Sequence, residues 1–117
     1  MCSRLTTLTR AAEQAGIDRE RIVLDPGIDL GKSWQQSLHL LGRFTDLAAL
    51  GLPLLLAVSS KIFLRRALAL EDAPLDVATA AACALGAMHG GSVVRVHDAR
   101  IGRQAADLAY ALRVARS

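Results

Sequence analysis

The sequence predicts an α/β fold in which helices alternate with the strands of a parallel sheet. Stretches with helical apolar spacing give way three times to a short, continuous apolar run. These runs begin roughly 35 residues apart, which is the length of one strand–helix unit. Hydrophobic residues make up 52% of the 117 residues and aromatic residues only 3%. The core must therefore consist of Ala, Leu and Val, which suits helices packed closely on a buried sheet.

The first helix and the first strand are predicted in the N-terminal part of the chain. A helix that stops at Gly16 is indicated by residues at helical spacing, namely Leu5, Leu8, Ala12 and Ala15. The apolar run over residues 21–25 then predicts a short strand, and Pro26-Gly27 predicts the turn that closes it.

A second helix is predicted to begin at Ser33, because Gln36 three residues later completes a capping-box spacing. One face of this helix comprises Trp34, Leu38, Leu41, Thr45 and Ala48. Gly51 ends the helix, and Pro53 prevents its return. The continuous apolar run over residues 54–58 predicts a strand buried on both faces.

The C-terminal half continues the same alternation. We predict a short helix over residues 62–70, an Ala-rich helix over 74–88, a strand over 92–96 and an amphipathic helix over 101–112. Connections of this kind are right-handed and make the strands parallel. Three strands leave two open sheet edges, whereas a closed barrel needs eight strands. Either further strands come from another chain or the piece packs differently, so we expect self-association or a partner chain.

Charge and composition argue against several classes of protein. The net charge is +3 and the arginines are scattered, so nucleic-acid binding has little support. No apolar run reaches the length of a membrane span, and the first residues lack the apolar region of a secretory signal. The two cysteines, Cys2 and Cys83, have no metal-binding or redox spacing. We therefore expect a cytoplasmic protein that does not contact a membrane.

The most distinctive polar residues follow the three predicted strands. Asp25 ends the first strand, Ser59 and Lys61 follow the second, and Arg95 and His97 lie at the end of the third. Ligands of parallel α/β proteins bind at these carboxyl ends. Arg and Lys together bind phosphate or diphosphate, His adds a donor, and a carboxylate accepts paired N–H bonds. The pattern indicates a site for an anionic, nitrogen-rich ligand.

Two other interpretations of these residues stay open at this point. Each polar residue could be structural, for example if Asp25 capped its own loop or paired with Lys61 or Arg95. The segment from Gly27 to Ser33 also has some likeness to a phosphate-binding P-loop. It has three residues between its glycines where the P-loop needs four, so we give a nucleoside triphosphate site low weight.

Three motifs resemble those of the dihydropteroate synthase family. The segment DPGIDLGK at residues 25–32 resembles the family's DPGIGFGK, and SSK at 59–61 resembles its SRK after a similar Pro-Leu-Leu strand. RVHD at residues 95–98 reproduces the family motif. The order and spacing agree as well, and the resemblance extends from about residue 10 onward.

The resemblance implies a fold, an activity and roles for individual residues. The fold would be the last three βα units of a TIM (β/α)₈ barrel, with residues 1–117 forming the C-terminal portion of that domain. The activity would be a transferase of folate biosynthesis that condenses dihydropterin diphosphate with p-aminobenzoate, usually with Mg²⁺ held by a residue outside this chain. Asp25, Lys61, Arg95 and His97 would bind the pterin and diphosphate, and Ser59 would face p-aminobenzoate. None would be a catalytic acid or base.

The chain also departs from the family pattern. Asp29 stands at a family Gly, Leu30 at a Phe and Ser60 at an Arg, and residues 73–76 replace an Arg-x-x-Gly-Thr stretch. We expect the 117-residue chain alone to be inactive, because the residues of the family's early strands are absent from it. The alternative is a non-catalytic homologue or partner subunit that binds a pterin or phosphate. A methyltetrahydrofolate-binding methyltransferase is a more distant possibility, which RVHD disfavours.

Overall fold

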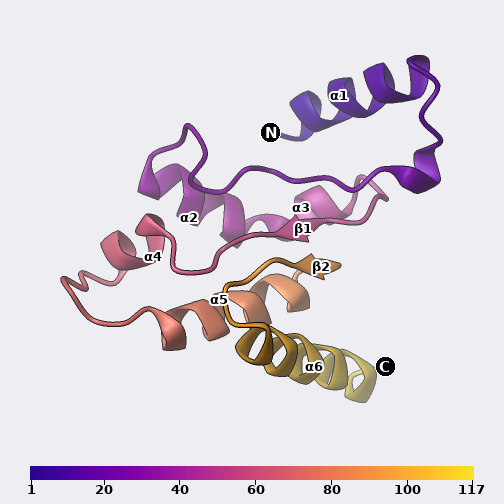
Figure 1. Ribbon diagram of the computed structural model, residues 1–117. Coiled ribbons are helices and arrows are strands. Elements are labelled where there is room, and N and C mark those ends of the chain that lie inside the picture. The colour runs from indigo at the N-terminus through magenta and orange to yellow at the C-terminus, as the bar shows by residue number, and fades with distance from the viewer.

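The computed structural model describes residues 1–117 and shows helices arranged around a small parallel sheet (Figure 1). The elements in chain order are α1 (Cys2–Gln14), the 3₁₀ helix η1 (Arg19–Arg21), α2 (Trp34–Gly42), α3 (Phe44–Ala48), β1 (Leu55–Leu56), α4 (Ile62–Ala67), α5 (Asp76–Met88), β2 (Val93–Val94) and α6 (Ala99–Ala115). The predicted alternation of helices and parallel strands is therefore confirmed.

The sheet is parallel but its strands are shorter than predicted. Strands β1 and β2 pair in register, with Leu55 opposite Val93. The predicted strand over residues 21–25 is wrong as an extended strand, because only Leu24 forms a parallel bridge, to Leu54. Its backbone N–H donates to the carbonyl of Pro53 over 2.8 Å, and its carbonyl accepts from Leu55 N–H over 2.8 Å. A strand segment with a neighbour on one side only has few ladder hydrogen bonds to extend it.

The predicted helix that starts at Ser33 is two helices in the structure. Helix α2 ends at Gly42, Arg43 leaves the helical conformation with φ −109° and ψ 25°, and α3 then begins at Phe44. The break follows a glycine, which is a poor residue for a helix interior. The short α3 buries Phe44 and Leu47 almost completely, so the change of direction adds two large side chains to the core.

The start of α2 has the capping box that the sequence predicts. The Ser33 side chain accepts a hydrogen bond from Gln36 N–H over 3.1 Å, and the Gln36 side chain accepts one from Ser33 N–H over 2.8 Å. We expect Ser33→Ala to lower the free energy of unfolding by about 1 kcal/mol, because it leaves helix N–H groups without this partner. Urea unfolding measures the change. Gln35→Ala on the same turn is the control, and equal effects of the two substitutions would contradict the prediction.

The core lies between the sheet and the helices that cover it. Leu54, Leu56 and Val58 are fully buried, as the apolar run predicts. Helix α5 packs on β1 and on α6, and α2 packs on α4 (Figure 1). The contact between α5 and β1 requires a glycine, because a Cβ at Gly86 would lie 2.2 Å from a methyl carbon of Leu56. This close packing of α5 on β1 fixes the position of the residues that follow β1.

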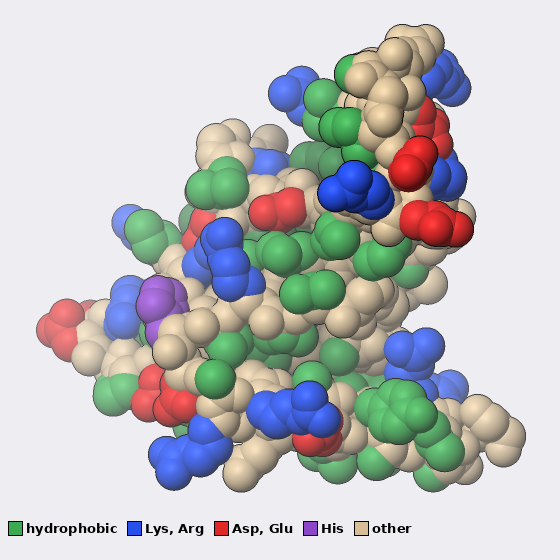
Figure 2. Space-filling model, turned by 45° about the vertical axis from the view of Figure 1, so that its right-hand side comes forward, with side chains coloured by type: hydrophobic (Ala, Val, Ile, Leu, Met, Phe, Trp, Pro, Cys, Tyr) green, Lys and Arg blue, Asp and Glu red, His purple; other side chains and the backbone are tan.

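Two surface observations bear on the expected partners. None of the helices combines the length and the apolar character that crossing a membrane would require. On the face seen in Figure 2, Lys and Arg side chains lie in several separate places, some next to Asp or Glu, and form no continuous strip.

Candidate functional site

The five site residues predicted from the sequence lie beyond the carboxyl ends of three neighbouring strand positions. Asp25 follows the bridge at Leu24, Ser59 and Lys61 follow β1, and Arg95 and His97 follow β2. Parallel pairing places these ends at the same edge of the sheet. The structure therefore brings together side chains that are up to 72 positions apart in the sequence (Asp25 to His97, 97 − 25 = 72). We call this edge the strand-end rim.

The loop after the first strand position is held by its own side chains. Asp25 Oδ1 accepts a hydrogen bond from Gly27 N–H over 2.9 Å. Lys32 Nζ donates to the carbonyls of Gly27 over 2.8 Å and Leu30 over 3.1 Å. Gly27 has φ +70°, and a Cβ there would lie 3.2 Å from Lys32 Nζ. Lys32 thus braces the loop, which differs from the phosphate-binding role of a P-loop lysine.

Lys61 lies where the three strand ends converge. It is the N-cap residue of α4, and its Nζ donates to the Ile28 carbonyl over 2.6 Å. Burial lowers the pKa of Lys61, and the nearby positive charges of Arg95 and Lys32 lower it further. The carboxylates of Asp25 and Asp29 act in the opposite direction and raise the pKa. Lys61 is therefore a half-buried ammonium surrounded by charges of both signs.

The lowered pKa of Lys61 predicts a rise in stability with pH. Between the folded-state pKa and the ordinary value of 10.5, the unfolded chain binds more protons than the folded chain. The free energy of unfolding therefore increases with pH in that window, whereas below it both states are protonated and the burial penalty is fully present. Urea unfolding of the wild type and Lys61→Met over this window measures the effect as a difference. Burial raises the pKa of the Cys83 thiol, but that contribution is common to both proteins. Parallel stability curves would contradict the prediction.

Ser59 and His97 form a hydrogen-bonded pair across the rim. Ser59 Oγ lies 2.7 Å from His97 Nδ1 and accepts a second hydrogen bond from the His97 backbone N–H over 3.1 Å. A hydroxyl that accepts from the backbone keeps its own hydrogen, which it can donate to Nδ1 when His97 carries its ring hydrogen on the other nitrogen. In that tautomer Nε2 of His97 is the ring N–H donor. Ser59 is only 8% exposed, so its hydroxyl is committed mainly to His97.

Arg95 is the cation of the rim that has no partner within the chain. Its backbone N–H donates to the Leu56 carbonyl over 3.0 Å, which extends the β1–β2 pairing. The guanidinium makes no hydrogen bond or ion pair, and the ion pairs of the chain are Arg19–Glu13, Arg43–Asp46 and Arg103–Asp107. An exposed, unpaired guanidinium beside Lys61 can bind a phosphate group in the bidentate manner typical of arginine.

Sequence reasoning missed three hydrogen bonds that shape the rim, all of them made by Asp29 and Ser60. Asp29 Oδ2 accepts a hydrogen bond from Phe63 N–H over 3.0 Å at the start of α4, and Asp29 N–H donates to Ser37 Oγ over 2.9 Å. Ser60 adopts φ 53°, and its N–H donates to Thr79 Oγ1 over 3.0 Å. These hydrogen bonds join residues that are 8, 19 and 34 positions apart, beyond the spacing of a helix turn or a strand, so no local pattern indicated them. The departures at Asp29 and Ser60 are thus structural parts of the rim.

The side chains of the chain do not fit a Mg²⁺ site by themselves. No group of three or more His, Cys, Asp or Glu side chains gathers anywhere in residues 1–117. At the rim, one oxygen of Asp25 and one of Asp29 already accept backbone hydrogen bonds. Mg²⁺ requires near-octahedral oxygen coordination. Its ligands would have to come from outside this chain or from phosphate groups.

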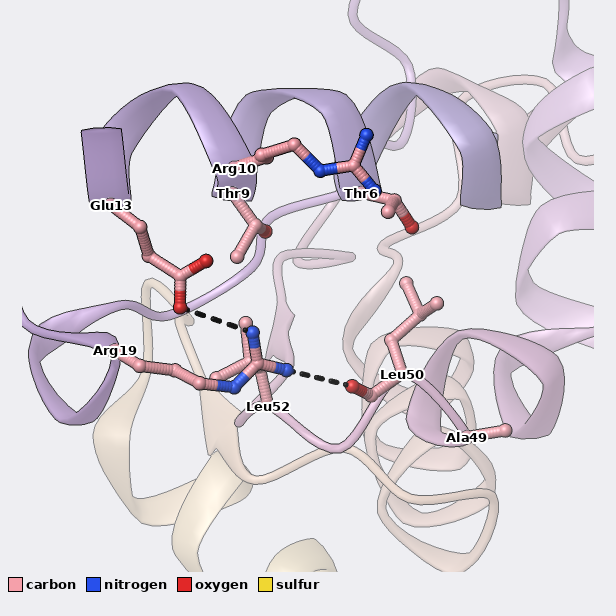
Figure 3. Close-up of a pocket in the computed structure, with 8 residues that line it drawn as sticks. All are labelled: Thr6, Thr9, Arg10, Glu13, Arg19, Ala49, Leu50 and Leu52. Carbon is pink, nitrogen blue, oxygen red and sulfur yellow. Dashed lines mark hydrogen bonds and ion pairs between the residues drawn. The ribbon is translucent and has the colours of Figure 1, made fainter. Parts of the chain in front are cut away.

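A separate cavity of about 360 Å³ lies at the opposite end of β1, between α1 and the segment that precedes this strand (Figure 3). Arg19 crosses it, with Nη1 3.3 Å from Glu13 Oε1 and Nη2 donating to the Leu50 carbonyl over 3.3 Å. These contacts connect α1 with the segment between α3 and β1. The cavity is remote from the strand-end rim, and two of its charged side chains, Glu13 and Arg19, are paired with each other.

Comparison with known proteins identifies relatives with the same arrangement. The family described as pterin binding enzyme matches residues 1–97. The chain is 38% identical over 100 residues to a dihydropteroate synthase of Bacillus subtilis, with 86% of this chain and 35% of the relative covered. A dihydropteroate synthase of Mycobacterium leprae is 42% identical over 95 residues, which covers 76% of this chain and 34% of the relative. The chain thus spans about a third of the length of these relatives.

Solved structures agree in fold. A dihydropteroate synthase of Xanthomonas albilineans in complex with 7,8-dihydropteroate superimposes with a TM-score of 0.86 at 33% identity, covering 95% of this chain and 44% of that one. A Coxiella burnetii dihydropteroate synthase in complex with pteroic acid gives 0.87 at 29% identity, covering 97% and 42%. The chain therefore belongs to the pterin-binding enzyme family, the family of the dihydropteroate synthases to which it is similar.

Proposed function

We propose that this chain supplies the pterin- and diphosphate-binding rim of a dihydropteroate synthase, a transferase that condenses dihydropterin diphosphate with p-aminobenzoate. One observation carries the proposal: an acceptor carboxylate, Asp25, lies at the same sheet edge as the cations Lys61 and Arg95 and the donor His97. Family membership and similar structures with bound pteroate or dihydropteroate support it.

The rim offers complementary groups for the two ends of such a ligand. After bonding to Gly27 N–H, Asp25 keeps Oδ2 and a second lone pair on Oδ1, so its carboxylate can accept the paired N–H groups of an aminopyrimidine edge. Lys61 uses one of its three protons on the Ile28 carbonyl and keeps two for a pterin oxygen or nitrogen. Arg95 and Nε2 of His97 would then bind the diphosphate. As the diphosphate leaves, the Arg95 guanidinium and the His97 ring N–H would stabilise the negative charge that develops on it.

The rim has fewer free groups that could bind p-aminobenzoate. Ser59 was expected to face this substrate, but its hydroxyl is hydrogen-bonded to the ring and the backbone of His97. We propose that Ser59 acts chiefly by orienting that ring. Leu30, which replaces a family Phe, is 62% exposed and so forms no buried apolar wall beside which an aromatic ring could bind. These two observations favour a second candidate for residues 1–117 taken alone, namely binding of the pterin diphosphate without turnover. The p-aminobenzoate side and the metal would then require groups from outside these residues.

Asp25→Asn tests the pterin half of the proposal. The amide still accepts from Gly27 but cannot accept a second pair of N–H groups as a carboxylate does. We expect the affinity for dihydropterin diphosphate, measured by calorimetric titration, to fall about tenfold or more, as for a lost hydrogen bond to a charged group. Affinity for inorganic diphosphate should not fall.

Inorganic diphosphate serves as the internal control, because it lacks the aminopyrimidine edge. Absence of dihydropterin diphosphate binding by the folded wild-type chain would refute the assignment for residues 1–117. Equal losses for both ligands in Asp25→Asn would show that Asp25 acts on the diphosphate site instead.

A further inference from the structure

Asp29 occupies an unusual backbone position between two loops of the rim. Its φ is 64°, in the left-handed region where Gly is favoured and where Asp and Asn are tolerated. The backbone is held there because its N–H donates over 2.9 Å to Ser37 Oγ, and Ser37 is fully buried in α2. The side chain is thus presented from a fixed backbone toward α4.

The Asp29 carboxylate caps α4 from a distant loop. Its Oδ2 accepts the N–H of Phe63 over 3.0 Å, across 34 positions of sequence. The first N–H groups of a helix have no partner within the helix, and the N-cap of α4, Lys61, provides no side-chain cap. Because the Phe63 side chain is fully buried, the carboxylate also fixes the point at which α4 enters the core.

A second hydrogen bond runs between the same two segments. Lys61 Nζ donates to the Ile28 carbonyl over 2.6 Å, next to the Asp29 contact. Residues 28 and 29 are therefore joined to residues 61 and 63 by two parallel cross-links. If the Asp29 link is lost, the start of α4 is freed from the loop that also holds the Lys61 ammonium.

We propose that Asp29 is a positioning residue of the rim, which binds the start of α4 and thereby holds the Lys61 ammonium against the loop of residues 27–31. The proposal rests on the proposed function in one respect, namely that Lys61 binds the ligand. Electrostatics support it, because Asp29 and Asp25 raise the pKa of Lys61 against the opposing effects of burial, Arg95 and Lys32. Asp29 therefore also helps to keep Lys61 protonated.

Two substitutions separate the hydrogen bond of Asp29 from its charge. Asp29→Asn keeps an acceptor oxygen and tolerates the left-handed backbone, but it removes the charge. Asp29→Gly tolerates the backbone and removes both acceptor and charge. Asp107→Asn is a matched control, because Asp107 is exposed on α6 and paired with Arg103.

The readout uses the fact that Lys32 and Lys61 are the two lysines of the sequence. Selective isotope labelling of lysine side chains gives an NMR spectrum with two ammonium sites, and Lys61→Met assigns them. We expect Asp29→Gly to lower the pKa of Lys61 and to make the Phe63 amide exchange about tenfold faster or more. Asp29→Asn should lower the pKa but restore the Phe63 amide protection. Asp107→Asn should do neither.

An unchanged Lys61 pKa in Asp29→Asn, or unchanged Phe63 exchange in Asp29→Gly, would overturn the proposal. Titration with dihydropterin diphosphate is made separately, and we expect affinity to fall about tenfold in Asp29→Gly, the size of one lost charge-assisted hydrogen bond. A wild-type chain that does not bind this ligand refutes the proposed function. The measurements on Lys61 and Phe63 still decide whether Asp29 holds the lysine.

Discussion

The double substitution Lys61→Met and Arg95→Met is expected to abolish measurable binding of both dihydropterin diphosphate and inorganic diphosphate. Lys61 is half-buried where the strand ends converge, and Arg95 is exposed without an internal partner. Each hydrogen bond from such a cation to a phosphate is worth about 1.5–3 kcal/mol, which corresponds to roughly 10- to 150-fold in Kd. Methionine retains much of the side-chain volume, so the loss of charge dominates. Calorimetric titration of the purified chain measures both affinities.

The design includes a control and a salt series. Arg113→Met removes an exposed arginine in the last turn of α6, at the end of that helix remote from the rim, and should leave both affinities unchanged. Wild-type affinity should weaken as salt is added, because added ions screen partly exposed charges. Binding that survives in the double variant would place the diphosphate elsewhere on the chain.

The largest expected effect on stability comes from Phe44→Ala. Phe44 is fully buried in the main core cluster, where α3 turns it toward the sheet. Truncating a buried Phe to Ala costs about 3–5 kcal/mol through lost burial and the cavity left behind. Domains of this size are stabilised by roughly 5–15 kcal/mol in total, so the variant should unfold at a much lower urea concentration. Urea unfolding followed by circular dichroism measures the shift.

Val77→Ala is the matched control for this prediction. Val77 is 84% exposed on α5, so removing its two methyl groups should change the free energy of unfolding by less than about 0.5 kcal/mol. If Phe44→Ala were as mild as Val77→Ala, the core would have to lie elsewhere than in the cluster around α3 and the sheet.

The alternation of helices and strands was predictable because each signal is local. The capping box of Ser33 and Gln36 was predicted from spacing and is present. The strand predicted from the apolar run over residues 54–58 is present as the shorter β1, with Leu54 and Val58 buried on either side of it. Spacing did not predict the break at Arg43 or the reduction of the first strand to a bridge at Leu24. Both features depend on which segments of the chain pack beside them, and a local sequence pattern holds no information on that packing.

The sequence by itself determined that Asp25, Lys61, Arg95 and His97 would meet, because parallel strands deliver their carboxyl ends to one edge of the sheet. Only the tertiary structure decided how each of these groups is committed. The Lys61 ammonium donates a hydrogen bond to the Ile28 carbonyl, the His97 ring is hydrogen-bonded to Ser59, and the Arg95 guanidinium alone has no partner. The tertiary structure also places the Asp29 carboxylate at the start of α4. Its hydrogen bond with Phe63 N–H (3.0 Å) and that of Lys61 with the Ile28 carbonyl (2.6 Å) join distant segments, and such contacts follow from packing. The spacing of residues in the sequence does not indicate such contacts.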